Sequence, residues 1–212
     1  AHTNAEGGKG SSEIGGAVYG GNDDADNSGT LQYIRLEYTG FAFDEEHEAN
    51  GISFYGVGNG TIVDHCQAYK GSDDGFEFFG GSVNVSNLVA VSCSDDSFDW
   101  TEGWNGKGTN LVAYQEDKST LGYDCDCLME CDNNGSNNAA TPVAHPVLKN
   151  LILVGNGGSK QGIRLRAGTE VEIDNAKVCG KGQPLTVETA LTENALKNGT
   201  SKLTNITLTS EL

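Results

Sequence analysis

The sequence predicts an all-β fold, a right-handed parallel β-helix of about six to seven coils that is a fragment of a longer solenoid. The first observation is a repeat: GSDDGFEFFGG at residues 71–81 returns as CSDDSFDWTEGW at residues 93–104, 22 residues further on. The second is strand alternation inside each copy, in which aromatic residues alternate with acids and so point to opposite faces. The third is a column of asparagines that recurs through the chain.

The alternation extends to segments before and after the two copies. We predict that one pair of apolar residues in each segment points inward and stacks into a core. These pairs are Ile52 and Phe54, Phe76 and Phe78, Phe98 and Trp100, Met129 and Cys131, Ile163 and Leu165, and Leu185 and Val187.

A second strand follows in each coil, and an asparagine precedes its apolar alternation. Stacked amides can hydrogen-bond along the coil axis, and asparagine tolerates the bent backbone of a tight turn. The sequence therefore predicts an asparagine ladder formed by Asn87, Asn110, Asn150, Asn175 and Asn205.

One domain at residues 1–212 accounts for the whole chain. The glycine-rich residues 1–29 are expected to form an incomplete first coil, and FAFDEEHEAN at residues 41–50 an acidic loop. Residues 115–122 and 133–145 are long polar excursions, which on a stacked coil are expected to share one face and carry the binding site. Residues 192–212 are expected to form a short helix capped by Thr192 and a last strand at residues 202–208.

Composition limits the partners of this chain. With 30 acids against 13 basic residues the formal charge is −17, which disfavours nucleic acid and anionic membranes and favours cations. No apolar run is long enough to span a membrane, and AHTNAEGGKG at the start is not a signal peptide, so we expect any export signal to have been removed. Six cysteines favour an oxidising, extracytoplasmic setting.

Several separate motifs carry a resemblance to a known family. GGNDDADNSGTLQYIRLEYTG, GVGNGTIVDH, SDDGFEFFGGSVNVSNLVA, ECDNNG, TPVAHPVLKNLILVG and GIRLRAGT together resemble a family of exported bacterial β-helix proteins of the pectate-lyase-like superfamily. The family is frequent in Bacteroidetes and marine proteobacteria, and the match covers residues 15 to about 190. The resemblance implies further coils before residue 20 and a secreted protein or surface lipoprotein. The chain departs from the pattern mainly in its cysteines at 125, 127 and 131.

A shorter resemblance concerns metal binding. HCQAY at residues 65–69 followed by SDDGFE at residues 72–77 is similar to a segment of family 9 polysaccharide lyases, whose corresponding acids bind calcium. That resemblance implies Asp73, Asp74 and Glu77 as calcium ligands.

The spacing of the acids leads to the same kind of site. Glu77, Asp99 and Glu130 are expected to point outward at the same position of successive coils and so to lie in one column. Clusters of carboxylate oxygens of this kind are typical of binding sites for hard cations. We therefore predict a calcium site at Asp73, Asp74, Glu77, Asp95, Asp96 and Asp99. The alternative is that the aspartates only form turns, their carboxylates accepting backbone N–H bonds, while Glu77 and Asp99 extend into water.

Other outward residues are candidates for glycan binding. Tyr55 and Phe79 lie beside the acids and are expected to stack on sugar rings, or else to shelter one another. Arg164 and Arg166 follow Glu130 on the same face, where they would bind acidic sugars or close the acid column as ion pairs. No residue matches a lyase base.

For the cysteines, column alignment favours a disulfide between Cys93 and Cys125. The spacing of Cys125, Cys127 and Cys131 is only a weak zinc pattern, because no fourth ligand is close in sequence.

Three functions are consistent with these features. The first is a calcium-binding protein, secreted or on the outer-membrane surface, that binds extracellular glycan or matrix without catalysis. The second is a calcium-dependent polysaccharide lyase on acidic glycans. The third is a structural adhesin or filament module that self-associates through its coil ends. The missing base disfavours the second, and long loops on one face would favour the first over the third.

Overall fold

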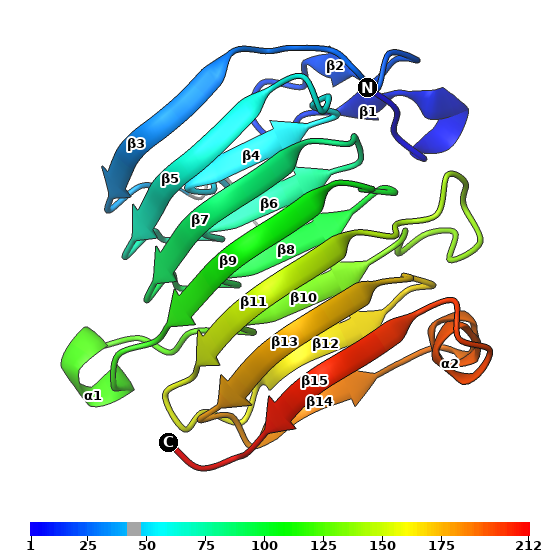
Figure 1. The fold of residues 1–212 in the computed structure, drawn as a ribbon. Coiled ribbons are helices and arrows are strands. Elements are labelled where there is room, and N and C mark those ends of the chain that lie inside the picture. Colours follow the sequence, from blue (N-terminus) through cyan, green and yellow to red (C-terminus); the bar gives the residue numbers. More distant parts are fainter. Residues whose placement is uncertain (42–47) are drawn as a thin grey trace.

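The protein is a stack of parallel strands, as the sequence predicts. The computed structural model describes residues 1–41 and 48–212, so most of the predicted acidic loop lies outside the described residues. Within these ranges the chain forms two parallel sheets, one of six strands and one of seven, whose neighbours come from successive coils (Figure 1). This arrangement confirms the prediction of a parallel β-helix.

The two sheets differ in strand length. The six-stranded sheet contains β4 (Ile52–Tyr55), β6 (Phe76–Phe79), β8 (Phe98–Thr101), β10 (Met129–Asp132), β12 (Gln161–Arg166) and β14 (Gln183–Val187). The seven-stranded sheet contains β3 (Thr30–Glu37), β5 (Ile62–Tyr69), β7 (Asn84–Val91), β9 (Lys107–Tyr114), β11 (Val147–Val154), β13 (Glu172–Cys179) and β15 (Lys202–Leu208). Each coil therefore contributes a short strand and then a long one.

The core lies between the two sheets and consists of stacked inward residues. Phe76 pairs in register with Phe98, and their ring centroids are 5.5 Å apart. Phe78 stacks on Phe54 at 4.8 Å and on Trp104 at 4.0 Å. The predicted inward pairs face this core, and stacked rings of this kind hold successive coils in one register.

The asparagine ladder is also present. The Asn110 amide donates to Asn87 Oδ1 at 2.9 Å, Asn150 donates to Asn110 at 3.0 Å, and Asn175 donates to Asn150 at 2.8 Å. All of these asparagines have positive φ, between 55° and 62°, a conformation that asparagine adopts more easily than most residues. The ladder ends at Asn175, because the Asn205 amide donates to Asp174 Oδ1 at 2.8 Å, so the prediction that Asn205 is its fifth member is wrong.

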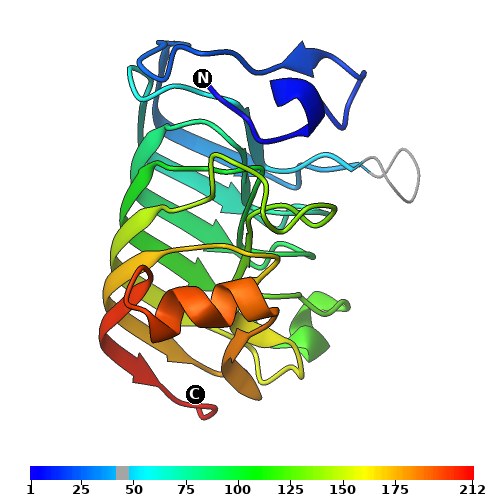
Figure 2. The ribbon, with the colours of Figure 1, turned by 90° about the vertical axis from the view of Figure 1, so that its right-hand side faces the viewer.

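The two ends of the chain differ from the prediction. Residues 1–29 contribute no strand to the parallel sheets; they form a 3-10 turn, η1 (Glu6–Gly8), and an antiparallel pair, β1 (Gly10–Ser11) and β2 (Val18–Tyr19). This segment lies at one end of the stack and β15 at the other (Figure 2). The helix α2 (Ala190–Lys197) begins earlier than predicted, after Thr189, so Thr192 is not its cap. Thr192 lies inside the helix, where it is buried and its hydroxyl accepts the Gly168 N–H.

The two long excursions do not share a face. The first, which contains α1 (Lys118–Leu121), follows β9 of the seven-stranded sheet, whereas the second follows β10 of the six-stranded sheet. They therefore leave the stack at opposite edges (Figure 1), and the loop argument for a glycan face is wrong. Among the described residues, no helix is long and apolar enough to cross a bilayer.

Candidate metal centre

The predicted acidic turns lie on one edge of the six-stranded sheet. Asp73 and Asp74 precede β6, and Asp95 and Asp96 precede β8. Asp74 Oδ1 accepts the backbone N–H of Asp96 at 2.9 Å, and Asp96 Oδ1 accepts that of Cys127 at 2.6 Å. The second aspartate of each turn therefore joins its coil to the next, as the turn alternative predicts.

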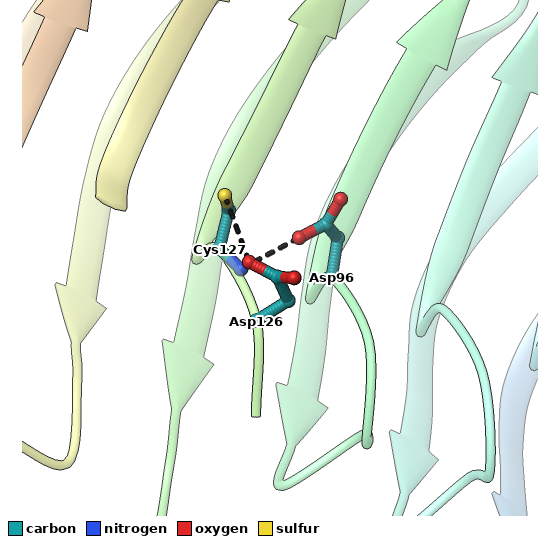
Figure 3. A group of neighbouring side chains, drawn as sticks. All are labelled: Asp96, Asp126 and Cys127. Atoms are coloured by element: carbon teal, nitrogen blue, oxygen red, sulfur yellow. Dashed lines mark hydrogen bonds between the residues drawn. The ribbon is translucent and has the colours of Figure 1, made fainter. Parts of the chain in front are cut away.

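The next coil extends this edge. Figure 3 shows Asp126 and Cys127 beside Asp96, with the Cys127 thiol directed at Asp126 Oδ1, 3.4 Å away. Lys160 from the following coil pairs with Asp126 at 2.7 Å. A lysine thus neutralises the acidic edge on its C-terminal side.

A column of acids runs beside these turns. Glu77 pairs in register with Asp99, and Asp99 pairs with Glu130. Glu77 is only 7% exposed and its Oε2 accepts the Asn50 amide at 2.6 Å, while Asp99 Oδ1 is buried without a hydrogen-bond partner. The alternative in which Glu77 and Asp99 extend into water is therefore wrong. Like charges about 5 Å apart repel by about 3 kcal/mol at an effective dielectric near 20, so protons or a cation must offset this charge.

The acids enclose a cavity of about 230 Å³. Within three-residue groups, one ligand oxygen of each acid lies within 4.8 Å of the others, a spacing that one cation can bridge. All six predicted metal ligands belong to such groups. The cavity itself is lined by Glu13, Glu48, Asp73, Asp74, Glu77, Asp95 and Asp99.

Burial and mutual repulsion make these carboxyl groups weak acids. Burial, followed by the charge of Glu48, raises the pKa of Asp73 to about 7. Burial and Asp126 raise the pKa of Asp95 to about 6. Burial also raises the pKa values of Asp74, Glu77, Asp96 and Asp99 well above the usual range, with the neighbouring acids adding to it. At neutral pH the cavity therefore holds protons that a divalent cation would displace.

Two arginines close the C-terminal end of the acid column. Arg164 binds Glu130 at 3.0 Å and Glu188 at 2.9 Å, which confirms the ion-pair alternative for this residue. Arg166 binds Asp132 at 2.8 Å and also pairs with Glu130. Neither guanidinium is free to bind a sugar carboxylate without giving up a protein partner, so the structure disfavours both as glycan ligands.

The predicted aromatic platform is covered. Phe79 is only 8% exposed, and it stacks on Tyr55 at 4.7 Å. Tyr19 of the N-terminal segment packs on Tyr55 at 5.0 Å and donates its hydroxyl to Glu102 at 2.6 Å. Tyr55 and Phe79 shelter one another beneath this segment, as the alternative expects, so the structure disfavours both as a platform for sugar rings.

The comparison with known proteins agrees with the fold. A family model for a pectate-lyase-like β-helix domain matches residues 1–212. The chain belongs to this family. Neither a curated protein nor a solved structure matches the chain at a significant level. The pectate-lyase-like β-helix family fits a carbohydrate-related function, and the predicted superfamily is confirmed.

The cysteines of this pectate-lyase-like domain do not form the predicted disulfide. All six lie within the described residues and are free thiols, including Cys93 and Cys125. Cys66 and Cys131 are buried among core residues. Because no disulfide is formed, cysteine content no longer supports an oxidising compartment.

Sequence reasoning missed several residues of the cavity in this β-helix. Glu13 reaches the cavity from the N-terminal segment, and Glu48 reaches it from the coil before β4. Asn50 occupies the position before β4 that Asp74 occupies before β6. Asn50 Oδ1 accepts the backbone N–H of Asp74 at 3.2 Å. Asn50 could have been found by extending the column alignment one coil back, because it takes the place of Asp74. Glu48 aligns with Ser72 rather than with an aspartate, and Glu13 follows no repeat, so the alignment finds neither.

The raised pKa values predict an unusual pH dependence for the stability of the protein without bound metal. A carboxyl group whose pKa is raised by folding binds more protons in the folded state, so the free energy of unfolding falls as pH rises. We expect a loss of more than about 2 kcal/mol between about pH 4 and pH 7, the interval from an unfolded aspartate to the pKa of Asp73. Denaturant titrations in chelator at a series of pH values measure this loss of stability. The Asp73→Asn variant is expected to show a smaller dependence of the free energy of unfolding on pH. A stability that rises over this interval would contradict the assignment.

Proposed function

We propose that this pectate-lyase-like domain is a calcium-binding protein that acts outside the cytoplasm and binds acidic glycan without cleaving it. The observation that supports the calcium site best is the cavity itself, in which seven carboxylates converge and Asp99 Oδ1 is buried without a partner. Calcium accepts six to eight oxygen ligands in flexible geometry, which suits side chains from stacked coils. Asp73, Asp74, Glu77, Asp95, Asp96 and Asp99 are the proposed ligands.

The basic residues near the cavity favour binding over a lyase reaction. A lyase needs a base that is unprotonated when it takes the proton beside the uronate carboxylate. The hydrogen bond to Asp126 raises the pKa of Lys160, so this lysine keeps its proton. Arg164 and Arg166 are held by acids, and a guanidinium does not lose its proton in proteins.

The location rests on the resemblance to exported proteins, because the free cysteines give it no support. Self-association is a weaker proposal, supported by the end strands β3 and β15, each of which pairs on one side only. Such edges can add a strand from another chain.

Calorimetry with calcium and with acidic polysaccharides tests the proposed function. We expect calcium to bind with release of protons, because the ion must displace those held by the cavity. We also expect a polyuronate to bind without forming unsaturated products, which ultraviolet absorbance would detect. Unsaturated products would replace this proposal with the lyase, and a protein that binds neither calcium nor glycan would refute both.

A further inference from the structure

Lys181 is a buried lysine in the turn between β13 and β14. The residue is 0% exposed, and its aliphatic part packs so closely on Gly155 of the preceding coil that a Cβ atom there would lie 2.6 Å from Lys181 Cγ. The amine donates to Cys125 O at 3.3 Å and to Asn156 Oδ1 at 3.5 Å, both long for hydrogen bonds from a charged group. Among the residues that the structure describes, no carboxylate forms an ion pair with it.

Burial without an ion pair favours the neutral form of this amine. Transfer of an ammonium group out of water is unfavourable, so burial lowers the pKa of Lys181. A neutral amine has a lone pair and is a nucleophile, whereas an ammonium group is not. Lys181 therefore carries a more nucleophilic side chain than an exposed lysine.

Three successive turns bring an amide and a carboxylate to this amine. Asp124 precedes β10, Asn156 follows β11 and Lys181 follows β13, so all three lie where a long strand leads into the next short strand (Figure 1). The Asn156 Nδ2 group donates to Asp124 Oδ1 at 3.3 Å, and Asn156 Oδ1 accepts the backbone N–H of Gly158 at 3.2 Å. Because Asn156 Oδ1 lies 3.5 Å from Lys181 Nζ, the amide carbon lies no more than about 4.7 Å from that nitrogen.

Gly158 keeps open the space where these groups meet. A Cβ atom on Gly158 would lie 3.1 Å from Asn156 Oδ1 and 3.4 Å from both Asp124 Oδ1 and Lys181 Nζ. The amine, the amide and the carboxylate therefore converge on one point. A shift of about 1 Å would bring the amine within the 3 to 3.5 Å from which reacting atoms attack.

We propose that Lys181 and Asn156 form an intramolecular isopeptide bond. The neutral amine attacks Asn156 Cγ, a bond forms between Lys181 Nζ and Cγ, and the bond from Cγ to Nδ2 breaks. Asp124 accepts the proton that the amine loses and passes it to Nδ2, which leaves as ammonia. The Gly158 N–H stabilises the negative charge that develops on Asn156 Oδ1. The products are one amide and one ammonia molecule, so the step needs no oxidant and no cofactor.

The bond would join two successive coils at the C-terminal end of the stack. Asn156 and Lys181 lie 25 positions apart and directly follow strands that pair in register. The end strands β14 and β15 each pair with a neighbour on one side only. A covalent link that restricts the unfolded chain therefore stabilises the coil that has the fewest neighbours. The proposed calcium and glycan binding does not depend on this bond.

The intact mass of the denatured wild-type protein tests the proposal. We expect it to be lower than the mass of the sequence by one ammonia molecule. Trypsin is expected to release a branched peptide that joins the segments containing Asn156 and Lys181, because it does not cleave after an acylated lysine. Lys181→Met and Asn156→Ala are each expected to have the full mass of their sequences. Asn59→Ala removes another asparagine that precedes a glycine in a turn, and this control is expected to keep the loss of ammonia.

Two results would overturn the bond. One is a wild-type protein with the full mass of its sequence. The other is a loss of ammonia that persists in Lys181→Met and gives no branched peptide, since a succinimide formed at Asn156 and Gly157 releases ammonia without the lysine.

The role of Asp124 is tested separately. At a fixed time after synthesis, the crosslinked fraction of Asp124→Ala is expected to be at least about tenfold smaller than that of the wild type, because the proton transfer is lost. An unchanged fraction would overturn the role assigned to this carboxylate.

Discussion

Calcium is expected to raise the melting temperature of this protein, and a chelator to lower it. An ion that binds the folded cavity but not the unfolded chain adds RT ln(1 + [L]/Kd) to the free energy of unfolding, about 2.7 kcal/mol at a hundredfold excess over Kd. For a chain of 212 residues this corresponds to a shift of roughly 5 to 10 °C. Calorimetric melting curves at pH 8, with calcium and with chelator, measure the shift.

The double variant Glu77→Gln, Asp99→Asn identifies the source of that response. It removes two adjacent acids of the column, so the variant is expected to be no less stable than the wild type in chelator and to lose its calcium response. Glu6→Gln with Glu211→Gln removes the same charge from exposed positions and should leave the response intact. Melting curves that move with neither calcium nor chelator would end the metal proposal.

Arg166→Gln is expected to destabilise the protein by about 3 to 5 kcal/mol at pH 8 in chelator, because it leaves the buried Asp132 without a cation and leaves Glu130 with Arg164 alone. Arg166 binds Asp132 and Glu130, whose side chains are only 11% and 15% exposed. Burial raises the pKa values of both acids, so protonation replaces the missing cation at low pH. The loss in stability is therefore expected to be smaller at pH 5, and denaturant titrations at the two pH values measure the difference.

Lys197→Gln is the matched control for this substitution. Lys197 pairs with Glu193 on α2, with both side chains largely exposed, so its removal should change stability by less than about 0.5 kcal/mol at either pH. An Arg166→Gln variant that behaves like this control would show that the arginine does not hold the acid column together.

Much of the fold could be predicted from the sequence because a β-helix is built from local repeats. Alternation fixes which side of a strand is buried, and the repeat fixes which residues of successive coils are neighbours. Phe76 over Phe98 and Asn87 beside Asn110 follow from these two rules. The same rules place Glu77 beside Asp99 in the acid column.

The accessibility of the predicted site could not be read from these rules. Alternation describes Phe79 as outward-facing, but outward residues are exposed only where nothing else packs on them. The segment at residues 1–29 follows no repeat, so its position against the sheet was not predictable. It covers Phe79 through Tyr19 and adds Glu13 to the cavity.

By itself, the sequence determined the coil, its stacked core, the asparagine ladder and the column of acids, since each depends on residues that recur at a regular spacing. Only the tertiary structure decided which outward residues remain free for a ligand. Arg164 and Arg166 are bound by acids, whereas Lys149 and Lys177 have no acidic partner among the described residues. The physical reason is that exposure and ion pairing depend on segments distant in sequence, which no local period connects.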